Sequence, residues 1–330
     1  MTSRPDYDVV AVGNALVDVL AHEDEAFIER HGLVKGTATM VDAATADVVY
    51  AAMNPATEVS GGSAANTAVG IASLGGRSAY IGKVRDDQLG AVFAHDLRAA
   101  GVHFDTPPAT SGPPTGRCLV VVTADAERTM CTYLGSADQI GPDDIDDDLV
   151  ASAAVTYLEG YLWDQPAAKE ALRRAMSAAR SGGRMVALTM SDPFCVDRHR
   201  TEFLDLVRGP VDIVFANQHE LCSLFETDDV DRAIAEVRGM CEIVAVTRSE
   251  LGSVVVTQTD TYAVDVAPVD AVVDLTGAGD LYAAGFLYGL THDHDLPTAG
   301  AIGSMAAAEV IGHVGARPAV SLSDLATPLK

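Results

Sequence analysis

The residues with the clearest chemical potential lie in VVDLTGAGDLYAAGFLYGL, a segment that ends at Leu290. A strand-like run leads into the turn Gly277, Ala278 and Gly279, and Asp280 follows in the first turn of an apolar helix. Glycines let the backbone approach a ligand closely, and free N–H groups at a helix N-terminus stabilise the charge of a transferring phosphoryl group. Asp280 beside them could take the proton of an attacking hydroxyl. The alternative is that Asp280 only caps the helix.

Two further segments supply residues suited to a polyol. In EVSGGSAANTAVG, Gly61 and Gly62 precede a helix that carries Asn66 in its first turn, where its amide can donate and accept hydrogen bonds. The opening strand runs into GNALVD, which places Asn14 and Asp18 at the carboxyl edge of a sheet. This segment is not G-x-G-x-x-G, so a dinucleotide-binding fold is disfavoured.

The elements around these segments predict an α/β fold. Short Val-rich runs such as YDVVAV, MVALT, VDIVF and EIVAV alternate with helix-like stretches, which indicates a doubly wound, mainly parallel sheet flanked by helices. We expect residues 1–330 to form one domain. Residues of about 14–58 and 110–135 break the rhythm, and the second contains a hairpin between Thr115 and Leu134. We expect these insertions to form a small β-rich lid over the carboxyl ends of the strands.

Composition limits the partners. The 22 Lys and Arg residues against 47 Asp and Glu give a net charge of −25, which argues against nucleic acid but leaves a locally held nucleotide admissible. The five cysteines form no C-x-x-C pair, so a disulfide framework and a zinc site are not indicated and a reducing cytoplasm is expected. No apolar run is long enough for a membrane span. We expect small-molecule partners, and a homodimer remains open.

Other candidate motifs have simpler explanations. There is no G-x-x-x-x-G-K-[ST], because Val84 follows Lys83, and no H-R-D with D-F-G. His292 and His294 suggest a metal, but a polar loop before a helix explains them better. On the expected hairpin, Arg117 and Arg128 could reach a phosphate, although we favour a role in solubilising an edge strand.

The two motifs GGSAAN and DLTGAGDLYAAGFL resemble the signature motifs of the PfkB/ribokinase family, in the family's order and spacing. AN-x-x-E appears from Asn217 to Glu220, and a V-T strand end appears at Val246 and Thr247 with Gly252 beyond it. Unlike some members, the chain has Arg248 rather than glycine after Thr247. The resemblance covers nearly the whole chain and implies a ribokinase-like fold, ATP as co-substrate, Mg²⁺ and, in many members, a monovalent cation such as K⁺.

The resemblance also implies roles by position. Asp280 corresponds to the catalytic base, with Gly277, Ala278 and Gly279 as the anion hole. The acceptor-binding positions are Asn14, Asp18, Gly61, Gly62 and Asn66. Glu159 in YLEGYLW is a further candidate for the acceptor site, with a position beside the core as the alternative. The ATP-binding positions are Asn217, Glu220, Thr247, Ser249 and Gly252. Glu220 would hold Mg²⁺ through water, and Asp274 and Thr276 fall where many members bind K⁺.

Within the family, GNALVD and the two-part lid look closest to bacterial adenosine kinase-like members. This similarity predicts transfer of the γ-phosphoryl group of ATP to a nucleoside, adenosine first. The alternatives are a kinase of a sugar such as ribose or fructose, and a kinase-like binding protein without catalysis. A nucleoside base needs apolar or aromatic surface. The candidates for that surface are Leu16, Met40, Met130, Tyr133, Tyr161, Trp163 and Phe194. For each of them a position in the core is the favoured alternative.

Overall fold

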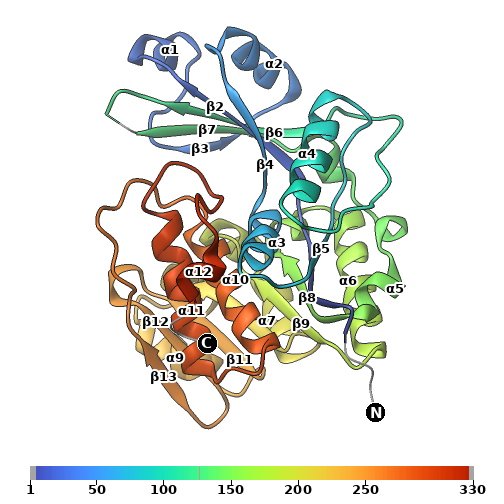
Figure 1. Ribbon diagram of the computed structural model, residues 1–330, viewed down its shortest axis with the longest axis vertical. Coiled ribbons are helices and arrows are strands. Elements are labelled where there is room, and N and C mark those ends of the chain that lie inside the picture. The colour runs from blue at the N-terminus through green and yellow to red at the C-terminus, as the bar shows by residue number, and fades with distance from the viewer. Residues whose placement is uncertain (1–4, 126, 327–330) are drawn as a thin grey trace.

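The computed structural model describes residues 5–125 and 127–326, and its centre is a large, mainly parallel sheet (Figure 1). The eight strands follow the order β13-β12-β11-β10-β9-β8-β1-β5, and the antiparallel pairs are β11 with β12 and β12 with β13. In chain order they are β1 (Tyr7–Val12), β5 (Ser78–Ile81), β8 (Ala153–Glu159), β9 (Met185–Thr189), β10 (Ile213–Asn217), β11 (Ile243–Thr247), β12 (Ser253–Val256) and β13 (Thr261–Val264).

Helices cover both faces of this sheet, because strands buried on both sides present apolar side chains in both directions. In β1, Val9 and Ala11 pack into one core, and Val10 and Val12 pack into the other. The first face carries α3 (Ser63–Ser73), α10 (Ala278–Thr291), α11 (Leu296–Val310) and α12 (Leu322–Ala326). The second carries α5 (Asp147–Ser152), α6 (Pro166–Ser181), α7 (Pro193–Arg208), α8 (Gln218–Leu224) and α9 (Val230–Val237). The doubly wound prediction is confirmed.

A second, five-stranded sheet lies at one end of the protein (Figure 1). Its order is β3-β7-β6-β2-β4, and β6 and β7 form the expected antiparallel hairpin. Its strands are β2 (Leu16–His22), β3 (Ala38–Met40), β4 (Thr57–Gly61), β6 (Gly116–Val122) and β7 (Arg128–Tyr133). Helices α1 (Glu25–Arg30) and α2 (Ala43–Ala52) cover its outer face, and α4 (Gln88–Ala99) packs beside β4.

The two faces of this second sheet differ, because side chains alternate along each strand. Val17 and Val19 of β2 point outward and pack in a core shared with α1 and α2. A smaller apolar cluster, which we call the inner cluster, lies on the other face. It consists of Leu20, Cys118, Val120, Val122 and Met130.

The prediction that Arg117 and Arg128 solubilise an edge strand is wrong. Strands β6 and β7 lie inside the sheet, whose edges are β3 and β4. Arg117 pairs with Asp47 and stacks its guanidinium over the ring of Tyr50, whereas Arg128 pairs with Asp274, outside the second sheet. Within residues 5–125 and 127–326, no helix is long and apolar enough to cross a membrane.

Candidate active site

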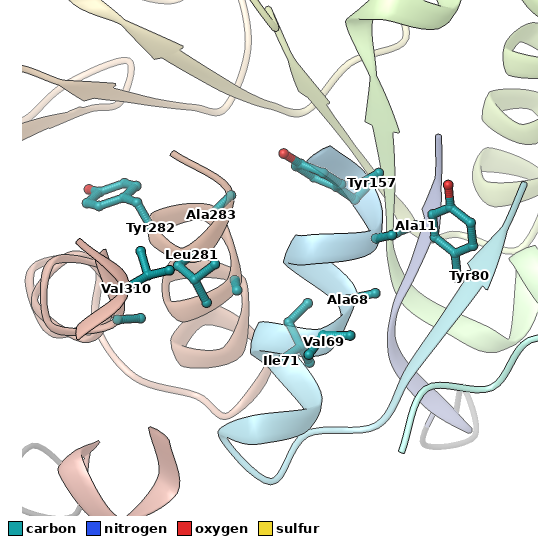
Figure 2. Close-up of a cluster of buried hydrophobic side chains, with 14 of the residues drawn as sticks. Ala11, Ala68, Val69, Ile71, Tyr80, Tyr157, Leu281, Tyr282, Ala283 and Val310 are labelled. Carbon is teal, nitrogen blue, oxygen red and sulfur yellow. The ribbon is translucent and has the colours of Figure 1, made fainter. Parts of the chain in front are cut away.

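The two glycine motifs meet because their helices pack closely. Figure 2 shows α3 and α10 side by side, with Ile71 on α3 and Leu281 on α10. A Cβ at Gly70 of α3 would lie 2.7 Å from Leu281 and 2.6 Å from Ala284, so only glycine permits this approach. The N-termini of both helices are thereby brought to one place, at the end of the large sheet nearest the second sheet.

Asp280 lies at this junction and contacts α3 rather than capping its own helix. Ser63 Oγ donates to Oδ1 at 2.6 Å, and Asn66 Nδ2 donates to Oδ2 at 2.8 Å. The N-cap of α10 is Gly277, and no side chain caps it. Burial raises the pKa of Asp280, against the opposing effect of these hydrogen bonds and of the Arg317 charge. The structure therefore excludes the simple capping explanation, and burial favours the protonated form of Asp280.

The turn before Asp280, where we expected an anion hole, leaves backbone N–H groups unpaired among the described residues. Gly277 has φ +80°, a backbone angle that disfavours any side chain. A Cβ there would also lie 2.9 Å from the Cα of Ala316, which is too close. Gly279 has open space where its Cβ would be. The first turn of a helix leaves N–H groups without intrahelical carbonyls, and those of Gly279 and Asp280 bond to no other described residue. The turn therefore offers free backbone donors, and the Cβ position of Gly279 beside them is open.

The polyol candidates surround the same point. Gly61 lies against the carboxyl group of Asp18, and Gly62, with φ +95°, lies against the backbone oxygen of Asn14. Burial raises the pKa of Asp18 to about 6, while Arg317 and Arg128 oppose the rise and Asp280 adds to it. The sequence therefore predicted residues that the fold brings together from three separate segments.

Asn66 also has an unpaired hydrogen-bond acceptor. Its Nδ2 holds Asp280, but its Oδ1 is buried and accepts no hydrogen bond from the described residues. An unpaired buried acceptor costs about 1–3 kcal/mol, which a bound hydroxyl would recover.

Glu159, for which an acceptor site and a position beside the core were both open, is buried behind Asn14. It is 1% exposed, and it accepts from Asn14 Nδ2 at 2.7 Å, from Asn14 N at 3.3 Å and from Ala64 N at 3.0 Å. Burial raises the pKa of Glu159 to about 7 despite these hydrogen bonds. Its geometry ties the end of β1 to the start of α3, so Glu159 positions Asn14 and leaves no exposed oxygen for an acceptor.

Sequence reasoning missed Arg317 and Ser63. Arg317 Nη1 donates to Ala65 O at 2.8 Å, and Nε and Nη2 donate to Ser60 O at 3.0 and 2.8 Å, so one side chain clamps both sides of the Gly61-Gly62 turn. Burial lowers the pKa of Arg317 to about 10, against the charges of Asp18 and Asp280. Ser63 stands inside GGSAAN and could have been found there, whereas nothing in the sequence pairs Arg317 with this turn.

The ATP candidates line the neighbouring strand ends. Asn217 at the end of β10 pairs with Thr247 at the end of β11. Ser249 follows with φ +51°, and Gly252, with φ +77°, packs against the backbone oxygen of Val264. Gly252 is therefore required by the turn itself, whatever it contacts in a ligand.

The Asn217 and Glu220 pair forms a capping box at the start of α8. Asn217 N donates to Glu220 Oε2 at 2.8 Å, Asn217 Nδ2 donates to Oε1 at 2.6 Å, and Asn217 Oδ1 accepts from Glu220 N at 2.9 Å. Burial raises the pKa of Glu220 to about 7, and the charges of Asp192 and Asp280 add to this. A buried carboxylate among like charges is stabilised by a cation, and its two oxygens are already bonded, so these residues fit Mg²⁺ held through water.

Asp274 and Thr276 do not fit a resident monovalent cation. Arg128 Nη1 lies 2.6 Å from Asp274 Oδ2 and donates to Thr276 Oγ1 at 3.0 Å. Asp274 Oδ1 accepts from Thr276 N at 3.0 Å and from Thr276 Oγ1 at 2.7 Å, and Oδ2 accepts from Gly315 N at 2.8 Å. A guanidinium therefore holds the oxygens that K⁺ would need.

The candidates for a base-binding surface lie in different parts of the structure. Leu16 and Met130 belong to the inner face of the second sheet, and Met40 of β3 is 60% exposed. Tyr133 points to the opposite face and packs against the main core, and Trp163 is buried against Phe203, so these two candidates have the core positions that were the favoured alternative. Tyr161 and Phe194 are exposed near the ends of β8 and β9.

His292 and His294 lie directly after α10. His292 stacks on Tyr288 at the end of α10, with 4.0 Å between ring centroids. Over the described part of the chain, no group of three His, Cys, Asp or Glu side chains could bind a metal directly.

A turn with free N–H donors and a partly buried aspartate at a helix N-terminus, faced by a second sheet, fit a small-molecule phosphotransferase of ribokinase-like fold. Comparison with known proteins identifies the family. The sequence profile of the pfkB family of carbohydrate kinases matches residues 34–322, and the chain belongs to this family. Kinases of this family phosphorylate sugars or nucleosides and use ATP and generally Mg²⁺.

Three relatives illustrate the range of acceptors. The crystal structure of adenosine kinase from Sinorhizobium meliloti is 52% identical, covers 98% of this chain and 99% of its own, and has a TM-score of 0.91. A probable sugar kinase from Rhizobium etli CFN 42 is 49% identical, with 98% of each chain covered and a TM-score of 0.92. Adenosine kinase of Saccharomyces cerevisiae is 29% identical over 93% of this chain and 95% of the yeast protein.

Proposed function

We propose that the chain transfers the γ-phosphoryl group of ATP to the primary hydroxyl of a nucleoside, with adenosine as the preferred acceptor. The observation that carries this proposal is the inner face of the second sheet. There, Asp18 shares a face with Leu16 and with the apolar inner cluster, so a carboxylate suited to ribose hydroxyls lies on the same face as apolar side chains suited to packing against a purine. The 52% identity to a protein named adenosine kinase supports the same acceptor.

In the proposed reaction, the acceptor hydroxyl attacks the γ-phosphorus and the bond to the β,γ-bridging oxygen breaks, so that ADP leaves. Asp280 takes the hydroxyl proton, and the N–H groups of the Gly277–Gly279 turn stabilise the charge on the transferring group. Mg²⁺ supplies charge neutralisation on the ATP phosphates. Asp18 and the unpaired Oδ1 of Asn66 accept from the ribose hydroxyls, and Asn217, Glu220, Thr247, Ser249 and Gly252 hold the nucleotide side.

The second sheet would act as a lid formed by residues of about 14–58 and 110–135, within one domain of residues 1–330. Closing it over the acceptor would bury the base against the inner cluster and exclude water from the phosphoryl group. We also propose that the enzyme works in the cytoplasm, where its free cysteines would stay reduced.

Adenosine should bind more tightly than ribose in the absence of ATP. Each ribose hydrogen bond contributes only about 0.5–1.5 kcal/mol, because water competes for it. Burying about 100 Å² of purine surface adds about 2.5 kcal/mol, which corresponds to a roughly 50-fold difference in Kd. Calorimetric titration with both ligands measures this difference, and Met130→Gln should reduce the affinity for adenosine but not for ribose. Equal affinities would remove the nucleoside proposal and favour a sugar acceptor.

Glu220→Gln should raise the Mg²⁺ concentration that gives half-maximal rate, because the negative charge beside the metal's water shell is lost. The capping box should also weaken, by about 0.5–2 kcal/mol, since one amide group now faces an N–H donor. Glu236→Gln, which neutralises a partly exposed carboxylate on α9, serves as the control. An Mg²⁺ titration that coincides with that of the control would argue against a role for Glu220 in metal binding.

A further inference from the structure

Arg128 connects the second sheet to the loop that forms the anion hole. It is the first residue of β7, and its side chain is 11% exposed. Its Nη1 forms the 2.6 Å ion pair with Asp274, whose side chain is 5% exposed, and donates to Thr276 at 3.0 Å. Thr276 directly precedes Gly277, so the charge of a lid residue lies one residue from the anion hole.

Asp274 organises this part of the site. Its carboxylate accepts from Thr276 on one side and from Gly315 on the other, and thereby joins the turn at Gly277 to the segment that carries Ala316 and Arg317. Gly277 packs on Ala316, and Arg317 clamps the Gly61-Gly62 turn. A buried carboxylate without a cation is unfavourable by several kcal/mol. The shape of the anion hole therefore depends on a positive charge at Asp274.

We infer that Arg128 is the built-in cation of the anion hole, which makes phosphoryl transfer independent of an added monovalent cation. The inference rests on the proposed phosphotransfer function. Arg128 would act as a positioning residue, because it bonds to Asp274 and Thr276 and not to the reacting atoms. Arg128 belongs to the second sheet, so its charge reaches Asp274 only when that sheet lies as it does here. The anion hole is complete only in this arrangement.

The same side chain also influences the acceptor site. The Arg128 charge opposes the rise in the pKa of Asp18, so it favours the ionised form that accepts hydrogen bonds from an acceptor. Arg128 Nη2 is buried and has no hydrogen-bond partner among the described residues. One guanidinium thus lies within electrostatic reach of both the acceptor carboxylate and the anion-hole loop.

The test compares wild type, Arg128→Ala and Arg128→Lys in tetramethylammonium chloride and in KCl at constant ionic strength. We measure kcat, the KM of the acceptor and the melting temperature without substrates. Wild type should show the same kcat and Tm in both salts. Arg128→Ala should lose roughly ten- to hundred-fold in kcat without K⁺, because Asp274 is left unpaired. Increasing K⁺ should restore both its kcat and its Tm along saturable curves, and Arg128→Lys should lie between the two.

Arg117→Ala is the matched control. Arg117 belongs to the same sheet and is 8% exposed, but its partners Asp47 and Tyr50 lie on the outer face. Its loss should lower Tm equally in both salts.

The inference is overturned if wild type is activated several-fold by K⁺, if Arg128→Ala keeps its kcat, or if K⁺ rescues neither the kcat nor the Tm of Arg128→Ala. The Tm measurement needs no acceptor. A wrong acceptor assignment would therefore leave the cation result intact, and the two failures are distinguishable.

Discussion

Asp280→Asn is expected to lower kcat by about 10²- to 10⁴-fold, the usual contribution of a positioned general base. The amide cannot take the proton of the acceptor hydroxyl, but it has nearly the same shape as the carboxyl group. Burial already disfavours the charged form of Asp280, so replacing it with a neutral group should not lower the melting temperature. Steady-state kinetics and calorimetric binding of ATP measure the two effects separately.

Asp295→Asn distinguishes catalysis from the stability of a helix end. Asp295 is the N-cap of α11 and accepts from Thr298 N at 2.8 Å, so it has the capping role that Asp280 lacks. The variant should leave kcat near the wild-type value. A comparable loss of kcat in both variants, or a normal kcat in Asp280→Asn, would show that Asp280 is not the base.

Gly62→Ala should produce the largest loss of stability among single substitutions at the acceptor side. The added Cβ would collide with the backbone oxygen of Asn14, and φ +95° is unfavourable for any side chain. We expect a cost of about 3–5 kcal/mol, at the upper end of single-residue effects. The collision separates Asn14 from Ser63 and Asn66, so the KM of the acceptor should rise more than that of ATP in any folded fraction.

Gly75→Ala isolates the contribution of the backbone angle. Gly75 has φ +92°, but nothing lies within 4 Å of the position of its Cβ. Its replacement should cost only about 1–2 kcal/mol and leave both KM values unchanged. Urea unfolding of the two variants measures the difference. If Gly62→Ala is no more destabilised than Gly75→Ala, the close approach at Asn14 does not shape the site.

The parts of the site that could be predicted from the sequence are those whose structure depends on neighbouring residues in the chain. A glycine-rich turn before a helix lets the backbone approach a ligand and leaves free N–H groups at the helix start. Gly277, Gly279 and Gly62 could therefore be assigned from the residues next to them in the sequence. The β6–β7 hairpin was predictable in the same way, because two strand-like runs flank a short turn.

The parts that the sequence did not predict depend on partners far along the chain. Arg317 contacts Ser60 and Ala65 across more than two hundred residues, and Arg128 meets Asp274 across the gap between the two sheets. Both look like ordinary surface arginines in a single sequence. Trp163 was a reasonable candidate for base stacking by its type, but the packing of α6 and α7 buries it. Residue type alone does not reveal which face of a fold a side chain occupies.

The most direct test of the proposed function is the release of ADP from ATP and Mg²⁺ across a panel of nucleosides and free sugars, with the product identified by ³¹P NMR. The account predicts that adenosine gives the highest kcat/KM, that ribose and fructose react far more slowly, and that the product is a 5′-monophosphate formed in equal amount to ADP. A sugar that reacts faster than every nucleoside, or no ADP release with any acceptor, would contradict it.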